Sequence, residues 1–223
     1  MGYQFDFSDV LAYWPTLLYG VLITLELTLF GTSLGVALGI FCAWGRTNGP
    51  RPFRIVVGLY VELIRNTPFL VQLFFIFFGL PALGLELSAI QAAILATVIN
   101  LGAYSAEIIR AGIEATPKGQ IEAGASLGLT NIETFRHVVL KPALARIWPA
   151  LSAQIVIVML GTAVCSQISV QELTYAASFI QSRSFRAFEA YFIVTAIYLG
   201  LALILRQLLR LCGRILFPAQ RHS

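Results

Sequence analysis

Two pairs of oppositely charged residues, each three positions apart, are the residues of this sequence best placed to do chemistry. Glu62 and Arg65 lie inside a long apolar run, and Glu107 and Arg110 lie at the end of another. Residues three apart share one face of a helix, and charges at membrane depth pair with each other or face a cavity. The first pair is therefore either a structural ion pair or a site where Arg65 binds a carboxylate. The second pair is interpreted as structural, organising the polar segment that follows it.

Uncharged polar residues extend the first pair into a possible ligand path. Pro68 removes a backbone donor, so it can bend its helix and free the carbonyl of Ile64. Gln154 and Gly161 are two helical turns apart and share a face, although a helix–helix hydrogen bond is the alternative role for such residues. The path that we expect comprises Glu62, Arg65, Asn66, Thr67, Gln154, Gly161 and Thr162.

Catalytic and metal-binding patterns are missing from the sequence. It contains no nucleophile–base set and no GxxxxGK motif followed by Ser or Thr, so the chain is not expected to hold ATP phosphates. The three cysteines lie within or at the end of apolar runs without metal-ligand spacing, which is typical of embedded hydrophobic residues. His137 and His222 are interpreted as surface residues. We expect no catalytic residue, no metal and no cofactor in this chain.

The composition predicts an all-α integral membrane protein. Of the 223 residues 58% are hydrophobic and only 12% are charged, whereas a soluble domain has about 25% charged residues. A helix needs about 20 residues to cross the bilayer. Gly31, Gly35 and Gly39 recur every four residues and predict close packing against another helix. The apolar runs predict five spans, at about 17–44, 55–80, 87–109, 147–166 and 188–208, with a short turn at 80–84.

The charge distribution predicts the topology. Twelve of the fifteen Lys and Arg residues lie in three places: the short loop directly after the first apolar run, the polar loop 110–146, and the region near the C-terminus. Lys and Arg residues gather on the cytoplasmic side of the membrane. We therefore expect the N-terminus outside and the C-terminus in the cytoplasm. Residues 1–16 contain Asp6 and Asp9 but no Lys or Arg, so the first run is predicted to be retained rather than cleaved as a signal peptide. The net charge of +4 is not arranged as a basic stripe among aromatics, so no nucleic-acid partner is expected.

The loop 110–146 has the signals of two short helices. Thr116 before Pro117 predicts an N-cap and a first helical residue, opening a helix over 118–127 that ends near Gly128. Thr130 and Glu133 have capping-box spacing and predict the start of a second helix. Its apolar face would comprise Ile132, Phe135, Val138 and Val139, and Pro142 would end it.

Small residues are expected at the surface of the first of these helices. Ala123, Gly124 and Ala125 would let a partner approach closely. The alternative is an amphipathic loop that rests on lipid headgroups.

Three segments in the same order carry a resemblance to a known family. Residues 119–128, GQIEAGASLG, resemble the EAA loop of type I ABC-transporter permeases. Residues 62–72, ELIRNTPFLVQ, and 102–113, GAYSAEIIRAGI, resemble the polar amino-acid uptake branch, the histidine, glutamine and arginine type. The likeness covers about residues 15–215. It departs from the family pattern at Gly124, which replaces the usual second alanine, and at Pro142, which is displaced by one position.

The resemblance implies a membrane subunit of an ATP-binding-cassette importer that moves polar amino acids into the bacterial cytoplasm by alternating access. The EAA loop would be a coupling helix in which Glu122, Ala123, Gly124, Ala125 and Gly128 contact an ATPase. Implied partners are two cytoplasmic ATPase subunits that bind ATP and Mg, a second permease, identical or homologous, and a periplasmic or lipid-anchored binding protein. The implied domains are an outer segment 1–16, a permease domain 17–212 in the bacterial inner membrane, and a cytoplasmic tail 213–223.

Two other classes of function are alternatives to this one. An ion-coupled secondary transporter or channel would need intramembrane carboxylates as ion relays. The candidates are Glu26, Glu62 and Glu107, and two of these have arginine neighbours. No internal repeat is visible, which weakens this alternative. A membrane-bound enzyme is disfavoured because the sequence lacks a catalytic set.

Overall fold

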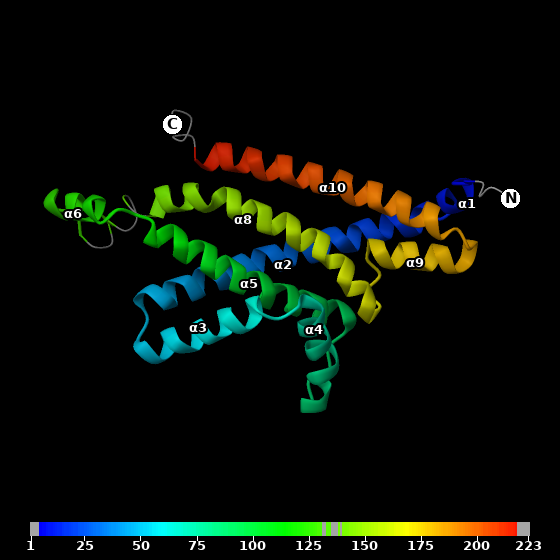
Figure 1. Ribbon diagram of the computed structural model, residues 1–223, viewed down its shortest axis with the longest axis horizontal. Coiled ribbons are helices and arrows are strands. Elements are labelled where there is room, and N and C mark those ends of the chain that lie inside the picture. Colours follow the sequence, from blue (N-terminus) through cyan, green and yellow to red (C-terminus); the bar gives the residue numbers. More distant parts are fainter. Residues whose placement is uncertain (1–4, 131–132, 135–137, 139, 218–223) are drawn as a thin grey trace.

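The chain folds into helices throughout the residues that the computed structural model describes, which are 5–130, 133–134, 138 and 140–217 (Figure 1). This confirms the all-α prediction. The long helices are α2 (Trp14–Asn48), α3 (Arg51–Arg65), α5 (Ala89–Glu114), α8 (Lys141–Gly161) and α10 (Ala187–Leu216). The shorter ones are α1 (Ser8–Leu11), α4 (Phe69–Phe74), η1 (Phe75–Gly79), η2 (Pro81–Leu83), α6 (Lys118–Ser126), η4 (Thr162–Ile168) and α9 (Leu173–Ser184).

Four stretches of the described residues are long and apolar enough to cross a membrane: Trp14–Thr47, Ala89–Glu114, Pro142–Ile168 and Ala187–Leu216. A fifth span is formed if the bent pair Arg51–Arg65 and Phe69–Leu83 counts as one. Several helices continue beyond the apolar runs that predicted them. α10, for example, ends at Leu216 rather than near residue 208. A helix has no reason to stop where the hydrocarbon ends, because its backbone hydrogen bonds are internal.

The glycines of α2 make its close contact with α5. A Cβ atom added to Gly31 would lie 2.5 Å from Thr97 Cγ2, and one added to Gly39 would lie 2.4 Å from Ser105 Cβ. A Cβ atom added to Gly35 would lie 2.9 Å from Leu101 Cβ. The predicted packing face is therefore confirmed, and it holds α2 and α5 together along their length.

The second predicted span is not one continuous helix. α3 and the segment that begins with α4 are bent by 111°, because Pro68 is extended (ψ 138°) and the residue before a proline is disfavoured in helical conformation. The carbonyl of Ile64 that the break releases accepts a hydrogen bond from Gln72 Nε2 at 2.8 Å. Gln72 also donates to Thr67 and accepts from Asn100 Nδ2 of α5 at 2.9 Å. This network satisfies the broken backbone and fixes the bend.

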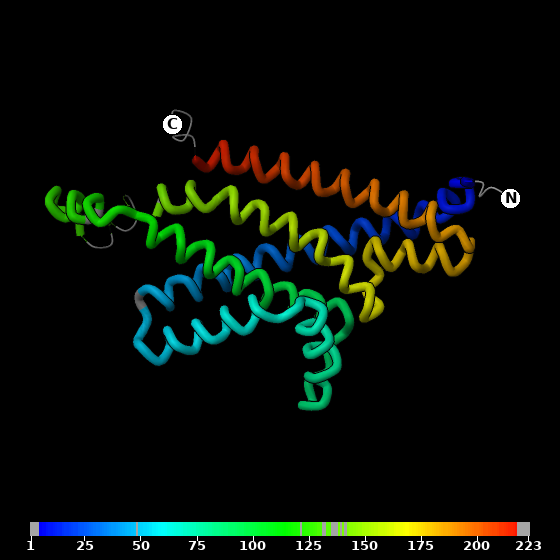
Figure 2. Tube along the Cα trace, in the orientation of Figure 1, coloured from blue at the N-terminus to red at the C-terminus, as the bar shows by residue number. Residues whose placement is uncertain are grey.

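The long helices lie along one axis of the molecule. α2, α5, α8 and α10 contact one another in sequence, while the segment after Pro68 turns away from them (Figure 1). Figure 2 shows the ends of the described chain at opposite ends of this axis, with the start of α2 near one and the end of α10 near the other. α6 lies beyond the ends of α5 and α8, at the same end as the last turn of α10.

A buried carboxylate fixes the other end of the molecule. The sequence predicted only a polar outer stretch for residues 167–186, but most of it forms α9. Glu172 caps this helix by accepting hydrogen bonds from the backbone of Thr174 and Tyr175 at 2.9 and 2.8 Å, and the Tyr198 hydroxyl of α10 donates to it. The Glu172 side chain is fully buried. Because its hydrogen-bond donors come from both helices, the cap also ties α9 to α10.

The environment of Glu172 predicts a pH dependence of stability. Burial raises the pKa of the Glu172 carboxyl above its ordinary value of 4.5, and its hydrogen bonds offset this only in part. The folded state therefore keeps this proton to a higher pH than the unfolded state, so the contribution of the group is full below about pH 4.5 and is lost as pH rises through the folded pKa. We expect the midpoint of thermal unfolding in detergent to fall as pH rises from about 4.5 through the folded pKa of Glu172. The fall should be smaller in Glu172→Gln. Identical slopes for the two proteins would contradict the prediction.

Candidate functional site

The segment α6 is held in shape at its C-terminal end. Gly128 has φ of +80°, a left-handed conformation that favours glycine. Its N–H bonds to the Ala125 carbonyl at 3.0 Å, and the Leu129 N–H bonds to the Gly124 carbonyl at 3.1 Å. These two bonds form a Schellman motif. The helix predicted over 118–127 and its end near Gly128 are thus confirmed.

The predicted N-cap of α6 is wrong. The helix begins at Lys118 with Pro117 in the capping position, where no side chain caps it. The Thr116 side chain is buried, and its hydroxyl has no hydrogen-bond partner among the described residues. Because the extended Pro117 delays the helix by one residue, Thr116 is one position too early to reach its first amides.

The exposure of the small residues in α6 is confirmed for two of the three. Ala123 and Ala125 are exposed, as are Glu122 and Gly128. Gly124 is buried instead, and an added Cβ would lie 3.1 Å from Thr134 Cγ2. The expected exposure of Gly124 is therefore wrong, because that face of α6 packs against the segment that follows.

The segment after α6 begins with the predicted capping box. The Thr130 backbone donates to Glu133 Oε2 at 2.9 Å, and the Glu133 backbone donates to Thr130 Oγ1 at 3.3 Å. Of its predicted apolar face, Ile132, Phe135 and Val139 lie outside the described residues. The prediction that Pro142 ends a helix is wrong, since Pro142 lies in the first turn of α8, where proline is favoured.

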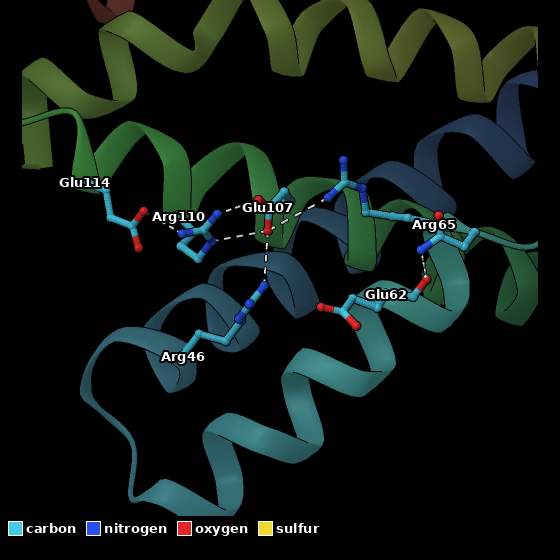
Figure 3. A network of polar contacts seen from close by, with 7 residues as sticks. Arg46, Glu62, Arg65, Glu107, Arg110 and Glu114 are labelled. Carbon is cyan, nitrogen blue, oxygen red and sulfur yellow. Dashed lines mark hydrogen bonds and ion pairs between the residues drawn. The ribbon is translucent and has the colours of Figure 1, made fainter.

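Glu107 of α5 is the centre of an ion-pair network at the same end of the molecule (Figure 3). It accepts hydrogen bonds from Arg46 Nη1 of α2 at 3.1 Å and from Arg110 one turn along α5. Arg65 Nη1 of α3 lies 3.9 Å from the same carboxylate, and Arg110 also pairs with Glu114. One carboxylate therefore joins the guanidinium groups of three helices. The predicted pairing of Glu107 with Arg110 is confirmed.

Glu62 and Arg65 do not pair with each other. Arg65 turns toward Glu107 and lies over the ring of Tyr104 at 5.6 Å. The Glu62 side chain is exposed and lies apart from Arg65 (Figure 3). It forms no ion pair with any of the described residues. The interpretation of this pair as a structural lock of one helix is therefore wrong.

The residues of the predicted path form two groups. Glu62, Arg65, Asn66 and Thr67 gather at the end of α3. Gln154, Gly161 and Thr162 lie on α8 and the start of η4. Among the described residues no hydrogen bond or ion pair joins the two groups. Thr162 is buried, and its hydroxyl donates to the Met159 carbonyl at 2.7 Å.

Three polar residues that the sequence did not single out complete this region. Arg46 reaches Glu107 from α2, and Gln72 and Asn100 bridge the bend to α5. Gln72 is the last residue of the segment 62–72 that resembles the amino-acid uptake branch, and this resemblance is the sequence signal that points to it. Arg46 and Asn100 carried none, because their partners are far away in the sequence.

Comparison with known proteins agrees with this architecture. Residues 35–214 match the family described as binding-protein-dependent transport system inner membrane component. The chain is 37% identical over 209 residues to the glutamine transport system permease protein GlnP of Escherichia coli (strain K12), covering 93% of this chain and 95% of the relative. It is 40% identical over 173 residues to the L-cystine transport system permease protein TcyB of Bacillus subtilis (strain 168), covering 78% and 74%.

A solved structure shares the whole arrangement. The crystal structure of an amino acid ABC transporter with histidines contains a chain that is 39% identical, with a TM-score of 0.88, covering 95% of this chain and 99% of that one. These matches place the chain in a class of multi-pass membrane subunits of transporters. The chain belongs to the binding-protein-dependent transport system inner membrane component family.

Proposed function

We propose that this chain is the permease subunit of an ATP-binding-cassette importer that moves polar amino acids into the bacterial cytoplasm. The observation that carries the proposal is the position and the exposed surface of α6. This helix lies beyond the ends of the membrane helices, presents Ala123 and Ala125 to solvent, and is closed by the Gly128 turn. A short helix with small exposed residues offers a surface on which another protein can pack closely.

The partners that we propose are an ATPase pair, a second permease and a binding protein. Two cytoplasmic ATPase subunits bind ATP and Mg, and one docks on α6 through Glu122, Ala123, Ala125 and Gly128, with Gly124 acting from behind as a packing residue. A second permease, identical or homologous, completes the path, and a periplasmic or lipid-anchored binding protein delivers the substrate. Closing of the ATPase pair moves the docked helices together and shifts the population from inward-facing to outward-facing.

The substrate class is proposed from the relatives and from the charges of the path. The relatives are named for glutamine and L-cystine transport, and a zwitterionic amino acid carries a carboxylate that an arginine binds well. Arg65 has a side chain that is 41% exposed although it lies near Glu107, so part of the guanidinium is open to a ligand. We propose that Glu62, Arg65, Asn66 and Thr67 border the path, with Gln154 and Gly161 in its second wall and the buried Thr162 packed behind that wall.

The orientation is part of the same proposal. Residues 1–16 lie outside, 17–212 form the permease domain with its coupling loop 110–146, and 213–223 form a cytoplasmic tail. The inner membrane of a bacterium is the expected location. The arginines at the α6 end of the molecule support this orientation, since basic residues gather on the cytoplasmic side.

The experiment that tests the function is uptake by the purified assembly. The chain is purified with the subunits that accompany it, reconstituted into vesicles, and supplied with labelled polar amino acids and its binding protein. We expect uptake that requires ATP inside the vesicle and survives dissipation of ion gradients by ionophores. Uptake that persists without ATP and collapses with the ion gradient would overturn the proposal in favour of a secondary transporter.

A further inference from the structure

The last part of α10 carries three arginines on one face. Arg206, Arg210 and Arg214 recur every four residues and are all exposed, so their side chains follow one side of the helix. α10 has 30 residues, which gives a length of about 45 Å, whereas the hydrocarbon core of a bilayer is about 30 Å thick. The arginine-bearing end of α10 therefore lies at the level of the lipid headgroups.

These arginines line a groove between α8 and α10. The groove has a volume of about 930 Å³, and no acidic residue lines it among the described residues. Its opposite wall on α8 is mostly apolar and includes Ala153, Val156 and Ile157, next to Ser152, whose buried hydroxyl has no hydrogen-bond partner among the described residues. Arg210 donates to the Gln207 side chain at 3.3 Å, and no ion pair is found for the three arginines within the described parts of the chain. The groove thus has a cationic rim and an apolar wall.

The end of the groove is built by Trp148. A Cβ added to Gly213 would lie 2.3 Å from Trp148 Nε1, so only glycine lets the indole lie against α10. The indole N–H donates to the Leu209 carbonyl at 3.0 Å, and its ring lies 5.8 Å from that of Phe217. The indole is thereby fixed in the groove with its polar edge satisfied, as expected for a tryptophan at a membrane interface.

We propose that this groove binds an anionic glycerophospholipid, with its phosphate on Arg210 and Arg214 and an acyl chain along the apolar wall of α8. Arginine is suited to phosphate because its planar donors match two oxygens at once. The apolar wall favours a lipid over free phosphate, which has nothing to bury there. A protein partner would have to bring carboxylates to this depth, whereas anionic headgroups are already present at the surface of the membrane.

The test uses Trp148 as the reporter. The chain has three tryptophans, and the double substitution Trp14→Phe/Trp44→Phe, at two exposed positions, leaves only the one in the groove. In that background, purified full-length protein in uncharged detergent is titrated with phosphatidylglycerol or phosphatidylcholine carrying brominated acyl chains, and quenching is measured. We expect phosphatidylglycerol to quench at a concentration roughly tenfold or more below phosphatidylcholine, because each arginine near the headgroups strengthens the attraction by roughly fivefold.

A matched pair of variants separates a site from general attraction to charge. Arg210→Gln/Arg214→Gln removes two exposed arginines from the groove, and Arg51→Gln/Arg54→Gln removes two exposed arginines from the start of α3. We expect the lipid preference to disappear in the first variant and to remain in the second. Native mass spectrometry should show the same loss of retained phosphatidylglycerol in the first variant only.

Three outcomes would overturn the inference. Equal loss in both variants would mean general electrostatic attraction. Displacement of the brominated lipid by inorganic phosphate at a similar concentration would mean a soluble anion site. No quenching by either lipid, together with a crosslink between copies of the chain from Ala153→Cys, would mean that a second permease covers the groove.

Discussion

Replacing Ala125 by arginine is expected to abolish ATP-driven uptake while the membrane domain stays folded. Ala125 is exposed on α6, and arginine has nearly the helix propensity of alanine, so α6 itself should persist. The long side chain would hold an ATPase away from the surface on which we propose that it docks. A clash at the centre of an interface costs roughly 2–4 kcal/mol, so a loss of at least about thirtyfold in uptake is expected.

The same position supplies the control. Ala125→Ser keeps a small side chain and should retain most of the uptake, while thermal unfolding of all three proteins should be similar. Crosslinking tests the docking directly. A crosslinker attached to Ala123→Cys in the assembled transporter should join this chain to an ATPase subunit. Normal uptake by Ala125→Arg, or crosslinks that never reach an ATPase in an active assembly, would end the proposal that α6 is the coupling element.

The features that the sequence predicted are those encoded by short spacings. Glycines four apart predicted the contact of α2 with α5, and Thr130 with Glu133 predicted a capping box that the structure shows. Apolar runs predicted the membrane helices, because burial in lipid requires about 20 consecutive residues without charge. Such signals depend on neighbours along one helix, so a single sequence contains them in full.

Features that depend on distant partners were missed or misread. The sequence showed that Pro68 could bend a helix, but the 111° angle depends on Gln72 and Asn100 closing the break. The sequence predicts only a polar stretch where α9 forms, because glutamate is not among the usual N-cap residues. Glu172 acts as the cap in the folded chain, where Tyr198 of α10 also bonds to it.

The pairing of Arg65 shows the same limit at the candidate site. Spacing alone paired Arg65 with Glu62, its neighbour on the same helix face. In the folded chain Glu107 offers a carboxylate that already collects Arg46 and Arg110, and Arg65 joins it. Ion-pair choice is thus decided by which helices lie together, which the spacing within one helix does not contain.

Replacing Glu107 by glutamine is expected to be the most destabilising change of a charged residue at this end of the molecule. The side chain is 23% exposed and faces Arg46, Arg65 and Arg110 from three helices. Without its charge, three guanidinium groups remain close together with no carboxylate between them. Removing one partner of such a partly buried network costs roughly 2–3 kcal/mol, which corresponds to a fall in the thermal midpoint of about 5–10 °C for a chain of this size.

Glu114 provides the matched comparison for Glu107. Its side chain is 57% exposed and, within the described part of the chain, pairs with Arg110 alone, so Glu114→Gln should cost less than about 1 kcal/mol. If the cost at Glu107 comes from uncompensated arginines, then Glu107→Gln/Arg46→Gln should be less destabilised than Glu107→Gln alone, since it removes one of the repelling charges. Equal costs for Glu107→Gln and Glu114→Gln, or a double variant that is worse by the full sum, would show that Glu107 acts as one surface charge among others rather than as the joint of three helices.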